Sequence, residues 1–159
     1  SPLADEAPSA ADAIYLPGGY PELHAGHLAT NAHFLDGLRT VAASGTAVYG
    51  ECGGYMVLGE GLVDGDGARH KMAGLLPLET SFARPRLHLG YRQLTLAADT
   101  PLGPAGACFR GHEFHYVEGN PGDAAPLFEA SDSLGQPLGP AGLRAGRVMG
   151  SFIHLVDAA

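Results

Sequence analysis

The sequence predicts an α/β fold in which an open, mostly parallel sheet is flanked by helices, with antiparallel strands in the second half. Two apolar, β-prone runs at residues 13–16 and 46–51 are separated by a stretch of helical spacing, and a second helix-compatible run follows them. Buried strands that alternate with helices in this way are typical of a parallel sheet. Later, residues 86–98 alternate between two faces, which is typical of an edge or antiparallel strand.

Composition narrows the class of protein. The 159 residues suffice for one domain with a substantial core. A formal net charge of −8 argues against nucleic acid and anionic membranes as partners. The two cysteines form neither a disulfide framework nor a zinc-finger spacing, so we expect a reducing, cytoplasmic location. No apolar run approaches the roughly 20 residues of a membrane span.

The chain opens with a segment rich in Ala, Pro, Ser and acidic residues. We expect residues 1–12 to be a linker or loop, followed by one domain over residues 13–159. The strand at residues 13–16 is cut off by a turn that contains Gly18 and Gly19. Two glycines after a strand expose backbone N–H groups that can hold an oxyanion, although a plain turn has the same signature.

A helical region is expected over residues 22–44, where apolar residues recur at helical spacing and a glycine ends the pattern. His24, His27 and His33 lie in or beside this region. Their spacing could suggest a metal site, but no pattern of carboxylate and histidine completes one. We therefore expect no metal in this chain.

The second strand ends in the run Gly50-Glu51-Cys52-Gly53-Gly54, and a helix-compatible run follows. This spacing is the thiol form of the nucleophile elbow, which usually carries serine. A helix that begins at Gly53 would set free N–H groups and its positive dipole end against the sulfur and favour the thiolate. The alternative is a buried cysteine in a glycine-rich turn, but the glycine spacing and the change from strand to helix favour a nucleophile.

A nucleophilic Cys52 needs a base, and histidine is the usual one. His154 follows an apolar strand pattern near the end of the chain, which would place it at a strand end close to Cys52. His112 and His115 are competing candidates on another expected strand. Spacing alone does not choose among the three.

The second half is expected to consist of short extended pieces joined by turns. Residues 59–70 form a polar turn region, and most of residues 119–146 are rich in Gly, Pro and Asp. The extended pieces are residues 73–78, 86–98, 107–109, 112–116 and 147–155, with 126–130 as a further possible strand.

Four stretches resemble the glutamine amidotransferase domain of the cobyrinic acid and hydrogenobyrinic acid a,c-diamide synthases. They occur in the order found in that family and span residues 13–155, nearly the whole chain. They are Tyr15-Leu16-Pro17-Gly18-Gly19-Tyr20-Pro21-Glu22, Tyr49-Gly50-Glu51-Cys52-Gly53-Gly54-Tyr55-Met56, Arg110-Gly111-His112-Glu113-Phe114-His115-Tyr116 and Gly150-Ser151-Phe152-Ile153-His154-Leu155. The resemblance implies a flavodoxin-like class I amidotransferase fold, with a first strand and helix that would lie upstream of residue 1.

The resemblance also implies a reaction. Cys52 would attack the side-chain amide of glutamine to give a glutamyl thioester, and His154 would move the protons. Arg110 is our candidate for a bidentate pair with the α-carboxylate of glutamine. The backbone N–H groups expected to hold the oxyanion belong to Gly18, Gly19 and Gly53.

Two departures from related enzymes matter. Many amidotransferases of this fold carry a Glu two residues after the histidine, where this chain has Val156. The family is expected to work as a Cys/His dyad, and Asp157 is not expected to replace that Glu. No GxxxxGK[ST] run occurs, so we expect the ATP and Mg²⁺ sites of the full enzyme in a separate synthetase domain and no cofactor in this chain.

Three functions remain to be distinguished. The first is the glutaminase half of an ATP-dependent a,c-diamide synthase, in which ammonia amidates corrin acetate side chains of cobyrinate or hydrogenobyrinate. The corrin would be bound by the synthetase domain, and the full enzyme could be a homodimer. The alternatives are a stand-alone cysteine hydrolase and a catalytically silent partner-binding module.

Overall fold

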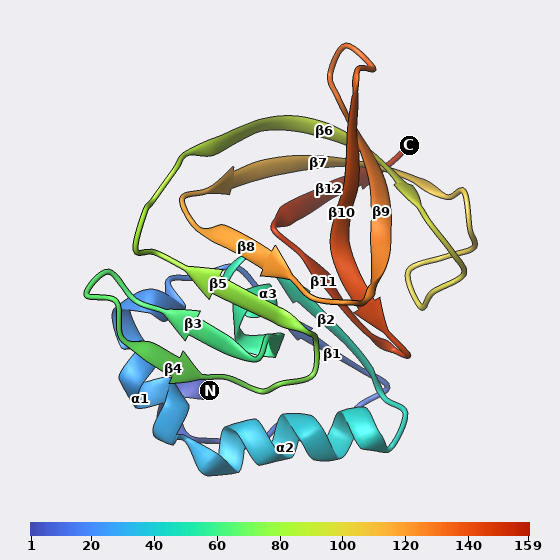
Figure 1. The fold of residues 1–159 in the computed structure, drawn as a ribbon. Coiled ribbons are helices and arrows are strands. Elements are labelled where there is room, and N and C mark those ends of the chain that lie inside the picture. Colours follow the sequence, from blue (N-terminus) through green and yellow to red (C-terminus); the bar gives the residue numbers. More distant parts are fainter.

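Two sheets and three α-helices make up the fold in a computed structural model that describes residues 1–159 (Figure 1). The main sheet has the strand order β1-β2-β11-β10-β9-β6-β7-β12, and a smaller sheet has the order β4-β3-β5-β8. The strands are β1 (Ala13–Leu16), β2 (Ala47–Glu51), β3 (Gly61–Val63), β4 (Arg69–Lys71), β5 (Leu78–Ser81), β6 (His88–Leu96), β7 (Cys108–His115), β8 (Glu118–Pro121), β9 (Ala125–Asp132), β10 (Pro137–Ala145), β11 (Val148–Ser151) and β12 (Ile153–Ala158). The helices are α1 (Ala25–Thr30), α2 (Ala32–Ala43) and α3 (Gly53–Leu58), with 3₁₀ turns η1 (Pro2–Ala4) and η2 (Pro21–His24).

The parallel part of the main sheet is formed by β1, β2 and β11. Gly50 of β2 pairs with Leu16 of β1 on one side and with Gly150 of β11 on the other, so the carboxyl ends of the three strands meet. The predicted α/β fold with antiparallel strands in its second half is confirmed. The parallel share is smaller than expected, because the remaining ladders of the main sheet are antiparallel. Short connections, such as residues 133–136 between β9 and β10, leave no room for the helical crossover that parallel pairing requires.

The helical segment expected over residues 22–44 forms three pieces, η2, α1 and α2. Asn31 has a non-helical backbone between α1 and α2, and its side chain donates a 2.7 Å hydrogen bond to the Pro2 carbonyl. Asp5 accepts a 2.9 Å hydrogen bond from the backbone N–H of Phe34 in the first turn of α2. Residues 1–12 contain only the short η1 turn, and these contacts hold them against the helices.

Two hydrophobic clusters form the core. The larger joins the three helices to the parallel strands and the smaller sheet, and all six residues of α3 are buried between these layers. The smaller cluster lies in the curled part of the main sheet and contains Leu94, Leu96, Leu127, Phe128, Ala130, Met149 and Ile153. Figure 1 shows β6 and β7 arching over the rest of the molecule. None of the helices has the length and apolar character needed to cross a bilayer.

Candidate active site

Cys52 occupies the corner between β2 and α3 in a conformation that only a few residues adopt. Its backbone has φ 49° and ψ −106°, and Asp5 is the only other non-glycine residue with a positive φ. A side-chain-bearing residue in such a region costs on the order of 1–3 kcal/mol, and these residues cluster at functional sites. The sharp turn expected from the glycine spacing is therefore present, and it places the sulfur at the carboxyl end of the parallel strands.

Glycine is required on both sides of the site because backbone and ring approach closely there. A Cβ atom on Gly53 would lie 2.6 Å from the Gly19 carbonyl oxygen, so the loop after β1 packs directly against the elbow. A Cβ atom on Gly18 would lie 2.7 Å from Cε1 of His154, whereas a Cβ on Gly19 would meet nothing within 4 Å. The glycine loop thus contacts both the start of α3 and the histidine ring.

One pocket of about 510 Å³ brings most of the expected site residues together. Cys52 and His154 both line it, and so do Gly18 and Gly19. The sulfur of Cys52 is hydrogen-bonded weakly to the Phe114 carbonyl at 3.9 Å, and no hydrogen bond joins it to His154. The remaining lining residues are Tyr15, Pro17, Tyr20, Glu22, Glu51, Met56, Phe82, Phe114, His115 and Tyr116.

His154 is held by a carboxylate that no sequence motif indicates. Oε1 of Glu51 lies 2.9 Å from Nδ1 of His154, and Oε2 of Glu51 accepts a 3.1 Å hydrogen bond from the Leu155 N–H. Tyr15 donates a third hydrogen bond, 2.9 Å long, to Oε1. An ionised carboxylate only accepts, so Nδ1 carries the proton and Nε2 of the neutral ring is left with a free lone pair.

Burial, with a contribution from the Glu51 carboxylate, raises the pKa values of two neighbouring groups. Burial and the hydrogen bond to Glu51 raise the pKa of Tyr15 to about 12, so the phenol remains a donor. Burial raises the pKa of the Cys52 thiol, and the carboxylates of Glu51 and Glu22 add to the rise, while the Gly53 N–H opposes it. The expected thiolate is therefore not the resting form, because α3 is short and the sulfur is buried beside negative charge.

The other candidates from the sequence lie elsewhere or are engaged. Arg110 is exposed on β7 and does not line the Cys52 pocket, so the structure does not bring it to the site. His112 is half-buried and pairs with His154 across β7 and β12. His115 lines the pocket, but its Nδ1 bonds the Val117 carbonyl at 3.0 Å and its Nε2 bonds Glu113 at 2.9 Å.

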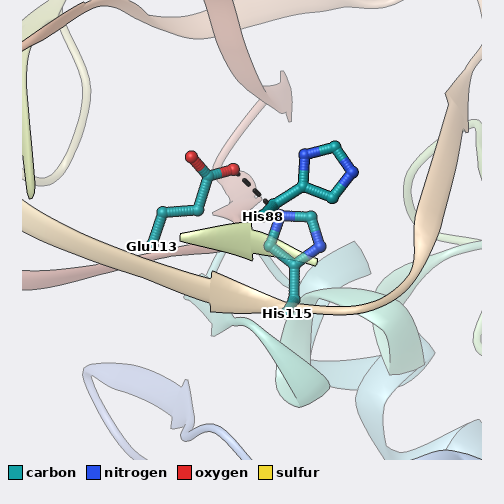
Figure 2. A group of neighbouring side chains, drawn as sticks. All are labelled: His88, Glu113 and His115. Carbon is teal, nitrogen blue, oxygen red and sulfur yellow. Dashed lines mark hydrogen bonds and ion pairs between the residues drawn. The ribbon is translucent and has the colours of Figure 1, made fainter. Parts of the chain in front are cut away.

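His88, Glu113 and His115 form the group whose geometry comes closest to a metal site, with ligand atoms within 4.8 Å of one another (Figure 2). Both hydrogen-bond partners of His115 are acceptors, so the two bonds together need a proton on each ring nitrogen. A ring in that state offers a metal no lone pair. The rings of His88 and His115 also stack with an interplanar angle of 4°, so one ion cannot lie in both ring planes. The cluster fits a hydrogen-bonded support better than a metal centre.

The histidines of the helical region do not assemble a comparable group. His24 and His27 line a separate cavity of about 410 Å³ with His70, which pairs with Asp64 at 2.6 Å. His33 is exposed on α2 and does not line that cavity. The absence of a metal from this chain stays a prediction.

Comparison with known proteins gives a consistent picture. Residues 1–158 match the family described as the CobB/CobQ-like glutamine amidotransferase domain. A hydrogenobyrinate a,c-diamide synthase of Sinorhizobium sp is 57% identical over 162 residues, which cover 100% of this chain and 36% of that protein. The protein of the same name from Brucella anthropi is 55% identical over 159 residues, covering 99% of this chain and 36% of the relative. The chain thus spans little more than a third of the length of these relatives.

Solved structures show the same fold at low sequence identity. The structure of PurLQS from Thermotoga maritima aligns with a TM-score of 0.63 and 20% identity, covering 94% of this chain and 71% of that chain. A crystal structure of a glutamine amidotransferase aligns with a TM-score of 0.55 and 20% identity. The alignment covers 90% of this chain and 70% of that chain.

Proposed function

The chain belongs to the CobB/CobQ-like glutamine amidotransferase domain family, and from this premise we propose that it is the glutaminase part of an ATP-dependent a,c-diamide synthase. It would release ammonia from glutamine for amidation of the acetate side chains of a corrin. The observation that carries the proposal is Cys52 on a strained elbow, sharing one pocket with a histidine whose Nδ1 is bound by a buried carboxylate.

The first step follows from the resting thiol. Nε2 of His154 takes the proton of Cys52 as the sulfur attacks the side-chain carbonyl carbon of glutamine. Glu51 accepts the Nδ1–H bond throughout and stabilises the imidazolium that forms. The Phe114 carbonyl, which the S–H faces in the free protein, loses this partner when glutamine enters.

The tetrahedral intermediate places a negative charge on the former carbonyl oxygen. Backbone N–H groups of the Gly18–Gly19 loop and of Gly53 are the proposed donors, and one such donor is typically worth ~10²–10³ in kcat. His154 then gives its proton to the departing nitrogen, which leaves as ammonia, and a glutamyl thioester remains on Cys52. Water, activated by His154, hydrolyses the thioester to glutamate and restores the thiol.

The identity of the acceptor is proposed from the relatives. Relatives that are 57% and 55% identical to this chain are named hydrogenobyrinate a,c-diamide synthase, which favours a cobalt-free corrin over cobyrinate. ATP and Mg²⁺ would act in the portion of such proteins that this chain does not span. We propose that the complete enzyme works in the cytoplasm, where thiols stay reduced.

Glutamate release by the complete enzyme tests the proposal. Cys52→Ser should abolish glutamine use while leaving amidation with free ammonia intact, because the amidation chemistry lies elsewhere. Glutamine hydrolysis that is equally fast without ATP and corrin would favour the stand-alone hydrolase. An enzyme that amidates with ammonia but never consumes glutamine would favour the silent module.

A further inference from the structure

A row of large apolar and aromatic side chains covers the outward face of β6 and β7 beside the Cys52 pocket. Leu89 pairs with Phe114 and Tyr91 pairs with His112, so these four side chains share one face of the antiparallel pair. Tyr91 is 71% exposed, and Leu89 and Phe114 are exposed as well. We call the set Leu87, Leu89, Tyr91, His112, Phe114 and Tyr116 the aromatic ladder.

Each aromatic ring of the ladder lies close to the next one. Ring centroids lie 5.5 Å apart for Tyr91 and His112, 6.4 Å apart for His112 and Phe114, and 5.7 Å apart for Phe114 and Tyr116. Exposed apolar residues scattered singly over a surface need no explanation, whereas a contiguous patch is typical of an interaction site. Aromatic side chains are also enriched in the centres of interfaces.

The ladder reaches the catalytic pocket. Phe114 and Tyr116 belong to the ladder and also line the pocket that holds Cys52. β12 is the neighbour of β7 in the sheet, and His154 on β12 pairs with His112 on β7. The proposed base therefore lies directly beside a ladder residue. A partner that covers the Phe114 and Tyr116 end of the ladder therefore lies directly beside the pocket that holds Cys52 and His154.

On the opposite face of β6 and β7, ion pairs and stacked rings hold the side chains in place. Glu113 bonds Arg92 at 2.7 Å and His115 at 2.9 Å. The His115 ring lies between His88 and Phe152, with centroid distances of 4.6 Å and 4.3 Å. Docking on a surface held in this way costs little ordering entropy, because its backbone is already set.

We propose that the aromatic ladder is the surface on which the ATP-using, corrin-amidating part of the complete enzyme docks. The inference rests on the proposed function. The relatives are nearly three times as long as this chain, which covers 36% of the Sinorhizobium protein. Ammonia must reach the acceptor before it is protonated by bulk water, and docking here sets the acceptor at the pocket mouth. A second copy of the chain would instead cover each mouth with another glutaminase.

Charge-introducing variants of exposed ladder residues test the inference in the complete enzyme. Leu89→Asp and Tyr91→Glu alter side chains that do not line the Cys52 pocket, and Leu134→Asp at an 84% exposed position is the matched control. Loss of an interface anchor of about 2 kcal/mol weakens docking ~30-fold. The ratio of amide formed to glutamate released should fall to roughly half or less in the two ladder variants and stay unchanged in the control, with ammonia-dependent amidation intact in all three.

Hydroxyl-radical footprinting gives a readout that does not need glutaminase activity. In the wild-type enzyme Tyr91 should react several-fold more slowly than its exposure in this chain predicts, and Leu89→Asp should restore the fast rate. Fast labelling of Tyr91 in the wild type overturns the inference, and so does protection that disappears on dilution, which would identify a second copy as the occupant. Protection without any glutamate release would sink the proposed function and leave the docking surface standing.

Discussion

The carboxylate of Glu51 lies 2.9 Å from Nδ1 of His154, although 103 positions separate the two residues in the sequence. Glu51 is the residue directly before Cys52, so one strand end supplies both the sulfur and the group that orients the base. The position two residues after the histidine is an exposed valine, Val156. The carboxylate that holds the histidine therefore comes from β2 and not from the strand that carries the histidine.

Glu51→Gln should lower kcat for glutamine hydrolysis by ~10²–10⁴ with little change in KM, because an amide no longer fixes the Nδ1–H tautomer. The measurement is steady-state glutamate release by the complete enzyme. Asp157→Asn, at an exposed position on β12, is the control and should behave as wild type. A Glu51→Gln enzyme with unchanged kcat would remove Glu51 from the mechanism.

Gly18→Ala should impair catalysis far more than Gly19→Ala. The new methyl group at position 18 would lie 2.7 Å from the His154 ring, whereas the one at position 19 meets nothing within 4 Å. Misplacing a catalytic ring by about 1 Å can cost ~10² in rate. Both variants should unfold at the wild-type urea concentration, and equal activities would show that the ring is not confined by the loop.

Alkylation of Cys52 by iodoacetamide should show a pH midpoint above that of an ordinary thiol, about 8.5. The reason is burial, to which the charges of Glu51 and Glu22 add. The experiment uses the Cys108→Ser background, because Cys108 is the second free cysteine and, unlike Cys52, is exposed. Glu51→Gln should lower the midpoint by removing a negative charge. A midpoint below that of an ordinary thiol would instead establish a preformed thiolate.

The His88 cluster should make folding sensitive to acid. Burial, with His115 nearby, lowers the pKa of His88, so the unfolded chain binds a proton where the folded chain does not. The stabilising contribution is then complete above about pH 6.5 and is lost as the pH falls below that value. Urea unfolding at several pH values should show the wild type losing stability relative to His88→Gln between about pH 7 and 5. A difference that does not vary with pH would contradict this.

The strand ends and the elbow could be predicted because they depend on local sequence. Glycine spacing marks the turn at Cys52, and the rule that parallel strands end at one edge brings Gly18 and Gly19 beside it. The protonation of Cys52 could not be predicted, since burial is a property of the folded core. The role of Arg110 stays a prediction: the residue does not line the Cys52 pocket, and nothing in the sequence reports how far along β7 that pocket reaches.

The contact between Glu51 and His154 could not be predicted, because it depends on the pairing register of strands that lie far apart in the sequence. Glu51 meets His154 because β11 pairs with β2 and places Ser151 beside Glu51, three residues before the histidine. Neither that pairing nor the crossing from β11 to β12 leaves a local pattern. The smaller parallel share of the sheet has a similar origin, because strand direction in the second half follows from connection lengths.

Peptide mass spectrometry of the complete enzyme, acid-quenched during glutamine turnover, tests the role of Cys52 most directly. We predict a glutamyl group on the peptide that contains Cys52, none on the peptide that contains Cys108, and no glutamate release by Cys52→Ala. Turnover of glutamine without that adduct, or by the Cys52→Ala enzyme, would contradict the account.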